Sequence, residues 1–344
     1  MPGLVVAVTG PTGEIGLPFI RALEARAEVA EIRGMARSPF DPAAHGWAKT
    51  TYVQGDILDR AAVDALVAGA DVVVHLAFII FGDPEASRRV NLEGSRNVFD
   101  ATVAAGATRL IYTSSVAAYG FHEDTPLPLT EDVPAAGSDD LYYSAHKAEL
   151  EQTLHGIVDS TGVETYVFRP CIVCGPESPA LLMNVPYVGT SSLVPEPLRS
   201  LIGRLPGTGP VLADPGVPLQ LVHADDVASA LVTGVLGEGP PGTYNLAADG
   251  EFTMTDLAHA LGWRSVPIPS MAIDLTAELV KRLPAMPAKT AWIHAARIPV
   301  TMDTARAREQ LGWTPGYDVQ TALTVTVDGA RRRGLVDDLG RRRT

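Results

Sequence analysis

Cysteine is scarce in this sequence, which has only two, Cys171 and Cys174. Two cysteines cannot build a disulfide framework, so the composition fits a reducing compartment. The C-x-x-C spacing of the pair is that of a redox motif, but such a motif normally opens a helix. Residues 167–175 are instead typical of a buried strand that ends in a turn. We therefore favour two structural cysteines over thiol chemistry.

Excess positive charge, a basic leader and long apolar runs are also absent. The formal net charge of −13 argues against general affinity for nucleic acid or anionic membranes. We interpret the arginine clusters at 331–333 and 341–343 as a solvated tail. No basic segment precedes the first strand-like residues at Leu4, and apolar runs such as 71–81 are far shorter than a membrane span. These absences predict a soluble, cytoplasmic protein without nucleic-acid or membrane partners.

A large apolar fraction with a regular period is what the sequence does have. Hydrophobic residues make up 46% of the 344 positions, enough for a sizeable core. In the first half, short apolar runs alternate with amphipathic segments, which predicts a parallel sheet covered by helices on both faces. We expect strands at 4–9, 29–36, 51–54, 71–76, 109–113 and 164–169, and helices at 14–25, 60–68, 86–105 and 141–158.

The character of the sequence changes after residue 170. Proline and glycine become frequent, and only three periodic segments follow, which are a strand at 219–222, a helix from 225 or 226 to 236 and a strand at 243–246. We predict a first domain at 1–170 and a mixed region at 171–344. In the mixed region, we expect a smaller lobe (about 175–218 and 250–300) to be interleaved with elements of the first domain (about 219–248).

A glycine-rich loop joins the first predicted strand to the first predicted helix. Glycines let the backbone turn tightly and approach a ligand, and the N-terminus of the following helix favours phosphate. A glycine triplet alone is weakly diagnostic, but this one has the strand–turn–helix context that dinucleotide-binding loops require. The predicted ligand-binding residues of the loop are Gly10, Thr12, Gly13, Glu14, Ile15 and Gly16.

The end of the second strand indicates which nicotinamide dinucleotide such a loop would hold. An acidic residue there would bind ribose hydroxyls and repel a 2′-phosphate. The sequence has Ala36 at this position, followed by Arg37. Because a guanidinium binds phosphate in forked geometry, we favour NADP. The alternative is NAD with a solvent-facing Arg37.

Tyr143 and Lys147 lie four residues apart and share one face of the helix predicted at 141–158. A lysine ammonium beside a phenol stabilises the phenolate and brings its pKa toward the working range. Ser114 and Ser115 end the fifth predicted strand, where ligands bind in parallel sheets. Together these residues predict proton transfer at a substrate carbonyl or hydroxyl.

These motifs together resemble the extended short-chain dehydrogenase/reductase family, the NAD(P)-dependent epimerase/dehydratase group. The resemblance covers most of the chain, and its pieces occur in the order that the family shows. Besides the glycine loop, the two serines and the tyrosine–lysine pair, the matching pieces are residues 55–59, 75–77, 90–97, 119–120, 169–170, 222–228 and 311–313.

The resemblance implies a doubly wound α/β sheet, a Rossmann fold, with a smaller C-terminal substrate lobe. By the same resemblance, Tyr143 would be the general acid/base. Lys147 would tune it and hold the nicotinamide ribose, and Ser115 would orient the substrate oxygen. The resemblance also implies that Asp56 and Ile57 contact the adenine, and that Leu76 and Ala77 contact the middle of the cofactor. Asn91 would position groups near the nicotinamide, and Pro170 would pack against the nicotinamide ring. Ser114 would lie beside Ser115, on the side of the cofactor.

Two further residues resemble catalytic residues by type and spacing. Tyr142 has a partner four residues on, His146, but the family pattern and the permanent charge of lysine favour Tyr143. His223 looks like a catalytic histidine, yet its segment starts a helix near the substrate lobe in the family pattern. We therefore favour a structural role for His223.

Two departures from the family pattern concern the substrate. Nucleotide-sugar enzymes of the family usually carry an asparagine where this chain has Ile172 and an arginine where it has Leu219. Without a polar reader and a phosphate clamp, a nucleotide sugar fits less well. Residues 177–218 are mostly apolar, with Arg199 and Arg204 as the only cations, which suits a small apolar carbonyl or alcohol at least as well.

We therefore predict an NAD(P)-dependent oxidoreductase that moves hydride to or from a small carbonyl or alcohol. One alternative is an NAD-dependent nucleotide-sugar epimerase or dehydratase. An alternative from another class is a non-catalytic NADP-binding sensor or scaffold. Family members often dimerise through the helices predicted here at 86–105 and 141–158, so a homodimer is a further expectation. No set of metal ligands is predicted.

Overall fold

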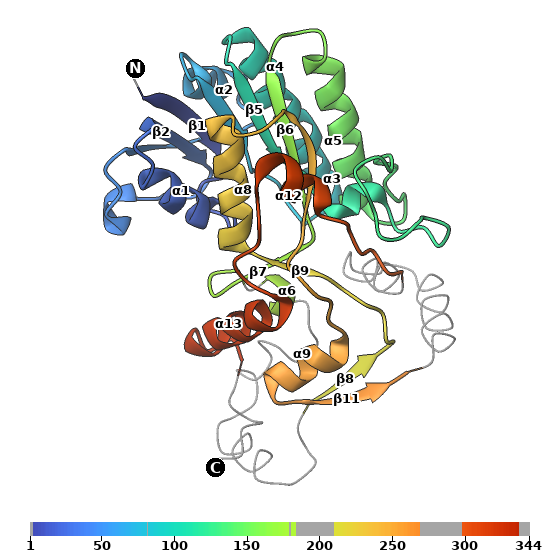
Figure 1. The fold of residues 1–344 in the computed structure, drawn as a ribbon. Helices are drawn as coiled ribbons and strands as arrows, with labels where there is room; N and C mark the ends of the chain where they lie inside the picture. The colour runs from blue at the N-terminus through green and yellow to red at the C-terminus, as the bar shows by residue number, and fades with distance from the viewer. Residues whose placement is uncertain (1–2, 81, 179, 184–209, 269–297, 337–344) are drawn as a thin grey trace. The chain divides into compact units, whose positions relative to one another are not determined.

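The computed structural model describes residues 3–80, 82–178, 180–183, 210–268 and 298–336. The chain divides into two compact units (Figure 1). Arg199 and Arg204 of the predicted substrate segment lie outside the described residues. The first unit consists of residues 1–171, 224–247 and 302–314, and the second of 172–223, 248–301 and 315–344.

A seven-stranded parallel sheet forms the centre of the first unit, which confirms the predicted Rossmann fold. The strands lie in the order β10-β6-β5-β4-β1-β2-β3. The winding reverses between β1 and β4, and ligands bind at the carboxyl ends of strands at such a point. The strands are β1 (Leu4–Thr9), β2 (Val29–Ala36), β3 (Thr50–Gln54), β4 (Val72–His75), β5 (Arg109–Thr113), β6 (Glu164–Pro170) and β10 (Gly242–Leu246).

Helices cover both faces of this sheet (Figure 1). On one face, apolar residues of α2, α4 and α5, such as Val63, Phe99 and Leu154, join Tyr112 of the sheet in one core. On the other face α1 and α8 pack together, and Gly234 of α8 lies close to side chains of β5 and β6. The helices of this unit include α1 (Gly16–Glu24), α2 (Arg60–Val67), α4 (Ser95–Ala104), α5 (Tyr142–Val158), α8 (Ala224–Leu236) and α12 (Ala305–Leu311).

The single helix predicted at 86–105 is interrupted in the structure. A short helix, α3 (Pro84–Arg88), is followed by a π-helical turn, η2 (Arg89–Gly94), before α4 begins. In this turn the side-chain oxygen of Asn91 accepts a hydrogen bond from Ile79 N at 2.8 Å, and its amide donates to Ile79 O at 3.0 Å. Wide turns of this kind are frequent at functional sites. Here the turn fixes the loop that follows β4.

The second unit has its own core, which contains Leu212, Phe252, Trp263 and Leu323. It includes two small parallel sheets, in which β7 pairs with β9 and β8 pairs with β11. Its described elements are β7 (Ile172–Cys174), α6 (Ala180–Met183), β8 (Val211–Asp214), β9 (Leu221–His223), α9 (Met254–Leu261), β11 (Arg264–Pro267) and α13 (Val319–Arg332).

Two expectations change in this unit. The strand predicted at 219–222 begins at Leu221, because Leu219 instead forms an isolated bridge with Phe252. Arg331 was expected in a solvated tail, but it lies in α13, forms an ion pair with Asp328 at 3.1 Å and donates a hydrogen bond to a backbone carbonyl of α9. That interpretation of the first arginine cluster is therefore wrong for Arg331.

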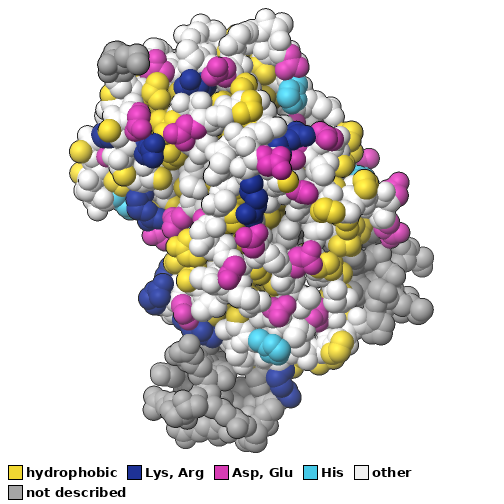
Figure 2. Space-filling model, in the orientation of Figure 1, with side chains coloured by type: hydrophobic (Ala, Val, Ile, Leu, Met, Phe, Trp, Pro, Cys, Tyr) yellow, Lys and Arg dark blue, Asp and Glu magenta, His cyan; other side chains and the backbone are white. Residues whose placement is uncertain are grey.

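The histidine and the two cysteines for which we favoured structural roles are buried in the structure. His223 is buried, and its ring stacks on Tyr317 with centroids 3.9 Å apart. Cys171 and Cys174 are buried, and Cys174 Sγ donates a hydrogen bond to Val222 O at 3.5 Å. Figure 2 shows acidic side chains scattered over the visible face with basic ones between them, as the net charge implies. Among the described residues, no helix has the length and apolar character needed to cross a bilayer.

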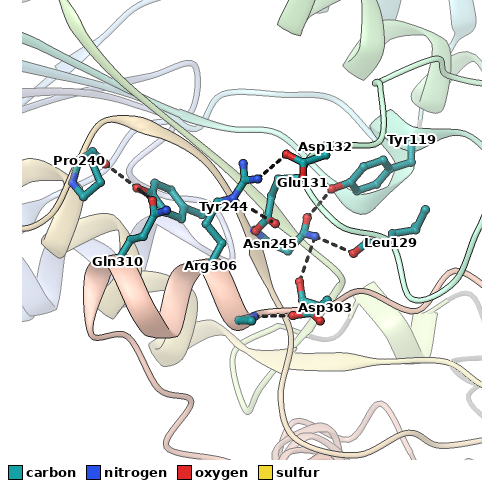
Figure 3. Close-up of polar contacts among 11 residues, drawn as sticks. Tyr119, Leu129, Glu131, Asp132, Pro240, Tyr244, Asn245, Asp303, Arg306 and Gln310 are labelled. Atoms are coloured by element: carbon teal, nitrogen blue, oxygen red, sulfur yellow. Dashed lines mark hydrogen bonds and ion pairs between the residues drawn. The ribbon is translucent and has the colours of Figure 1, made fainter.

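A buried polar junction ties three distant segments of the first unit together (Figure 3). Asn245 of β10 accepts a hydrogen bond from Tyr119 OH at 2.8 Å and donates to the carbonyls of Leu129 at 3.0 Å and Asp303 at 3.1 Å. Its backbone N–H donates to the Glu131 carboxylate at 2.8 Å. Fully satisfied networks of this kind rigidify a core. This junction fixes the segment after β5 to β10.

Replacing Asn245 by alanine should destabilise the protein. The variant leaves the hydroxyl of Tyr119 and the carbonyls of Leu129 and Asp303 without their partner in a buried site. We therefore expect the free energy of unfolding to fall by about 2–4 kcal/mol, measured by urea unfolding with far-UV circular dichroism.

Gln310→Ala is the matched control for this substitution. Gln310 is exposed, and its side-chain oxygen lies 3.2 Å from the Tyr244 hydroxyl, which donates its proton to Pro240 O at 2.5 Å (Figure 3). Its loss should change the free energy of unfolding by less than about 0.5 kcal/mol. Equal losses in the two variants would show that Asn245 has no special place in the core.

Candidate active site

Close backbone contacts shape the glycine loop after β1. Gly10 has a φ of +76°, and a Cβ at Gly10 would lie 2.8 Å from Ala77 N. A Cβ at Gly16 would lie 2.3 Å from Gly10 O, so only glycine fits at both positions. Ile15, the N-cap of α1, makes no side-chain cap. Leu17 N already donates to Gly13 O at 3.0 Å, and Pro18 has no N–H, so within the first three residues of α1 the N–H that can meet an anion is that of Gly16.

A cleft lies along this loop and the carboxyl ends of β2 and β4. Its volume is about 270 Å³, close to the roughly 300 Å³ at which small-molecule pockets begin. Some of the predicted cofactor-binding residues line this cleft and the others do not. That any of them binds a cofactor stays a prediction. Those that line the cleft are Gly10, Thr12, Gly13, Arg37, Asp56, Ile57, Leu76 and Ala77.

Arg37 stands at the edge of this cleft, directly after β2. Its side chain is exposed, and within the described part of the chain its guanidinium has no ion pair or hydrogen bond. Ala36 and Ser38 line the cleft beside it. An unengaged guanidinium next to a hydroxyl is a suitable partner for a phosphate group.

The structure brings Tyr143 and Ser115 into contact on one side of Lys147. Ser115 Oγ accepts a hydrogen bond from Ala117 N at 3.1 Å and is hydrogen-bonded to the Tyr143 side chain. The three side chains of the set are buried, with 9% of Tyr143, 6% of Ser115 and 3% of Lys147 exposed. Burial raises the pKa of Tyr143 to about 12, and the hydrogen bond from Ser115 acts against this rise. The phenol therefore holds its proton at neutral pH.

Three groups surround the ammonium of Lys147. Nζ donates to Thr113 O at 2.8 Å and to Tyr112 OH at 3.5 Å, and it lies 3.9 Å from the centre of the Phe78 ring. Burial lowers the pKa of Lys147 to about 7, and the charge of Glu151 acts in the opposite direction. A buried lysine with a perturbed pKa is a candidate functional residue, and here it packs against Phe78 of the cleft wall.

A buried ion pair lies one helical turn beyond Lys147. Glu151 accepts hydrogen bonds from Arg169 Nη2 at 2.5 Å and from Ser114 Oγ at 2.5 Å. The Arg169 guanidinium also lies over the Tyr119 ring at 4.4 Å, so the pair leads to the junction of Figure 3. Ser114 thus supports this pair, and its predicted contact with a cofactor stays a prediction.

His75 joins three elements beside this network. Its Nδ1 lies 2.7 Å from Thr9 Oγ1, and its Nε2 lies 2.8 Å from Ser95 Oγ. Burial lowers the pKa of His75 to about 3, and the charge of Lys147 adds to this effect. The imidazole is therefore neutral and holds the ends of β1 and β4 to α4.

Tyr142 has a different environment from Tyr143. It is half-buried, its hydroxyl donates to Ile80 O at 2.6 Å, and its ring meets that of His146 with centroids 5.5 Å apart. No described contact links Tyr142 to Ser115. The sequence interpretation that placed Tyr143 in the site and Tyr142 outside it agrees with this arrangement.

Two residues of the site were missed in the sequence. Glu151 lies four residues after Lys147, and this spacing places both on one helix face. It could have been found from that spacing and from the arginine that ends β6. Phe78 follows the motif at 75–77, but nothing in the sequence places its ring against a lysine.

Comparison with known proteins connects this geometry to a family. The chain matches the NAD dependent epimerase/dehydratase family over residues 6–247. A 3-diazoavenalumate denitrifying reductase from Streptomyces sp. is 30% identical over 91% of this chain and 96% of that protein. An uncharacterized protein of Mycobacterium tuberculosis is 27% identical over 92% of this chain but 29% of its own length. A 3beta-hydroxysteroid-dehydrogenase/decarboxylase of Arabidopsis thaliana is 26% identical over 81% of this chain and 52% of that protein.

Solved structures share the fold along the whole chain. The crystal structure of gox2253 has a TM-score of 0.73 and 23% identity and covers 97% of this chain and 99% of that chain. DesIV, a dTDP-glucose 4,6-dehydratase from Streptomyces venezuelae with NAD bound, has a TM-score of 0.72 and 22% identity. It covers 98% of this chain and 100% of that chain. A UDP-glucose 4-epimerase from Thermotoga maritima has a TM-score of 0.70 and 19% identity, with coverage of 96% and 99%.

Replacing Lys147 by methionine should change how stability depends on pH. The pKa of Lys147 is lowered from 10.5 to about 7 in the folded protein. The cost of burying its charge is therefore complete below pH 7 and diminishes as the pH rises toward 10.5. Between these values, the stability of the variant relative to wild type should fall by about 1.4 kcal/mol per pH unit. Unfolding experiments from pH 6 to pH 10 measure this difference.

Lys49→Met provides the control for this measurement. Lys49 is a half-buried lysine of the same unit whose Nζ donates to Arg26 O at 2.5 Å. An equal decline with pH in both variants would mean that the slope does not arise from the burial of Lys147.

Proposed function

The chain belongs to the NAD dependent epimerase/dehydratase family, a family of enzymes, and we propose that it is an NADP-dependent oxidoreductase acting on a small carbonyl or alcohol. The cofactor would supply or accept the hydride. The observation that carries the proposal is the buried contact between Tyr143 and Ser115 beside Lys147. These three residues belong to the same unit as the glycine loop.

The residues of the glycine loop fit a dinucleotide. Gly10 and Gly16 leave a cradle that a Cβ would fill, and the start of α1 offers the N–H of Gly16 to a phosphate. Asp56 and Ile57 line the same cleft beyond the end of β3. We assign them to the adenine end and the glycine loop to the phosphates.

The three catalytic residues would divide the proton chemistry among them. In the reductive direction, Tyr143 gives its phenolic proton to the substrate oxygen, and the Ser115 hydroxyl holds that oxygen. The Lys147 cation stabilises the phenolate that remains. Burial raises the pKa of Tyr143 to about 12, so the phenol carries at neutral pH the proton that reduction requires.

Two apolar positions support a small substrate over a nucleotide sugar. Ile172 and Leu219, which replace the usual polar readers, pack against the core of the second unit. The Streptomyces relative that matches along almost its whole length is described as a reductase, which favours net reduction. We therefore rank simple carbonyl reduction above epimerisation or dehydration.

Tyr143→Phe should abolish hydride transfer and leave cofactor binding intact. The substitution removes only the hydroxyl that moves the proton, so we expect turnover to fall by about 10²–10⁴-fold. The assay is a screen of aldehydes, ketones and nucleotide sugars with NADPH, followed by nicotinamide absorbance, and fluorescence titration measures binding. Tyr142→Phe is the matched control and should keep turnover within about threefold of wild type.

Three results would contradict this proposal. Full activity of Tyr143→Phe would remove the proton-transfer role. A physiological response that survives in this variant would favour a non-catalytic sensor. Turnover of a UDP- or dTDP-sugar without net change in nicotinamide absorbance would favour an epimerase or dehydratase.

Arg37→Ala should weaken NADP binding selectively. The guanidinium is unengaged at the edge of the cleft, so its loss removes a charge-assisted contact with the 2′-phosphate. We expect the Kd of NADP to rise by about 10-fold or more and that of NAD to stay within about twofold. Arg60→Ala is the control, since Arg60 pairs with Asp64 on α2. A wild-type preference for NAD, the cofactor named for solved relatives, would overturn this assignment.

A further inference from the structure

Phe78 is the aromatic side chain that lines the described cleft, and it contacts both members of the tyrosine–lysine pair. Its ring centre lies 3.9 Å from Lys147 Nζ. The same ring meets that of Tyr143 edge-on, with centroids 5.5 Å apart and an interplanar angle of 85°. Phe78 is half-buried. It therefore lies between the cleft and the ammonium.

The loop that carries Phe78 is held in a fixed position. Both polar backbone atoms of the next residue, Ile79, are bonded to the side chain of Asn91, which is fully buried. Asn91 was predicted to position groups near the nicotinamide. In the structure, the groups that it holds are those of the Phe78 loop.

We propose that Phe78 is a positioning residue whose ring face holds the Lys147 ammonium charged and in a fixed place behind the wall of the cleft. An ammonium has three donors. Thr113 O takes one at 2.8 Å and Tyr112 OH takes a longer one at 3.5 Å. The third N–H of the ammonium meets the negative face of the Phe78 ring. Such a cation–π contact stabilises a cation most when the cation is removed from water.

The ring of Tyr112 also lies near the ammonium, but its centroid is 5.0 Å from Nζ, whereas that of Phe78 is 3.9 Å away. His75 is neutral, and the charge of Glu151 is shared with the Arg169 guanidinium through two hydrogen bonds. Burial lowers the pKa of Lys147, and the ring acts against that effect. The titratable groups whose contacts or charges reach the ammonium are Glu151 of α5, Tyr112 of β5 and His75 of β4. Tyr143 contacts the same Phe78 ring as the ammonium.

A series of fluorinated phenylalanines at position 78 tests the proposal. Mono-, di- and trifluoro rings keep the shape of phenylalanine but progressively weaken its negative face. NMR titration of protein labelled with ¹³C-lysine reports the pKa of Lys147. The chain has only four lysines, and the spectrum of Lys147→Met identifies the signal. We expect this pKa to fall stepwise, by about 1 unit for the trifluoro ring.

Phe40 supplies the matched control for this series. It is a half-buried ring in the same unit that stacks on His45 with centroids 5.0 Å apart. The same fluorinated residues at Phe40 should leave the Lys147 pKa unchanged. A pKa that stays within about 0.2 units along the Phe78 series would overturn the proposal and leave Phe78 as a packing residue.

Phe78→Leu adds a catalytic readout, which rests on the proposed function. Leucine keeps apolar bulk but offers no ring face, so less of Lys147 is charged and the Tyr143 phenolate is less stable. The pH midpoint of kcat in the oxidative direction should move up by about 1 unit. An unchanged midpoint together with a flat NMR series would reject the role of Phe78. A graded NMR series without any hydride transfer in the screen would support that role and reject the proposed function.

Discussion

The buried ammonium of Lys147 is the constraint on which the arrangement of the first unit depends. A charge removed from water must be met by fixed partners, and here they come from separate elements. β5 supplies Thr113 O, the loop after β4 supplies the ring of Phe78, and α5 supplies the charge of Glu151. Each partner is itself anchored, by the Asn91 clamp on one side and by Arg169 on the other. The catalytic geometry is thus part of the hydrophobic core, not an addition to it.

Much of this unit follows from local pattern. Period and glycine placement located the strands of the sheet, and the spacing of Tyr143 and Lys147 identified the pair. The π-turn at 89–94 could not be predicted, because it depends on how the side chain of Asn91 meets the backbone of Ile79 in the preceding loop, which periodicity does not report. The place of Phe78 depends on the same contact. Local periodicity reports which face of an element is apolar, whereas these features depend on which elements meet.

The identity of the substrate is a separate question from the chemistry. The proton-handling residues lie in the first unit, whereas Ile172 and Leu219 belong to the core of the second. In the function that we propose, these two positions pack against that core and do not read a nucleotide sugar. A family of this kind keeps its reaction centre while other parts of the chain change the ligand.

The place of β10 in the sheet has a consequence for how the protein is made. This strand pairs with β6 but follows it by more than seventy residues of the second unit and of α8. Until β10 arrives, the growing chain presents β6 as an open edge, and Tyr119 lacks its buried partner Asn245. Residues 1–171 are thus an incomplete sheet that invites pairing with other chains. The sheet of the first unit is therefore completed only after residues 172–223 of the second unit have been synthesised.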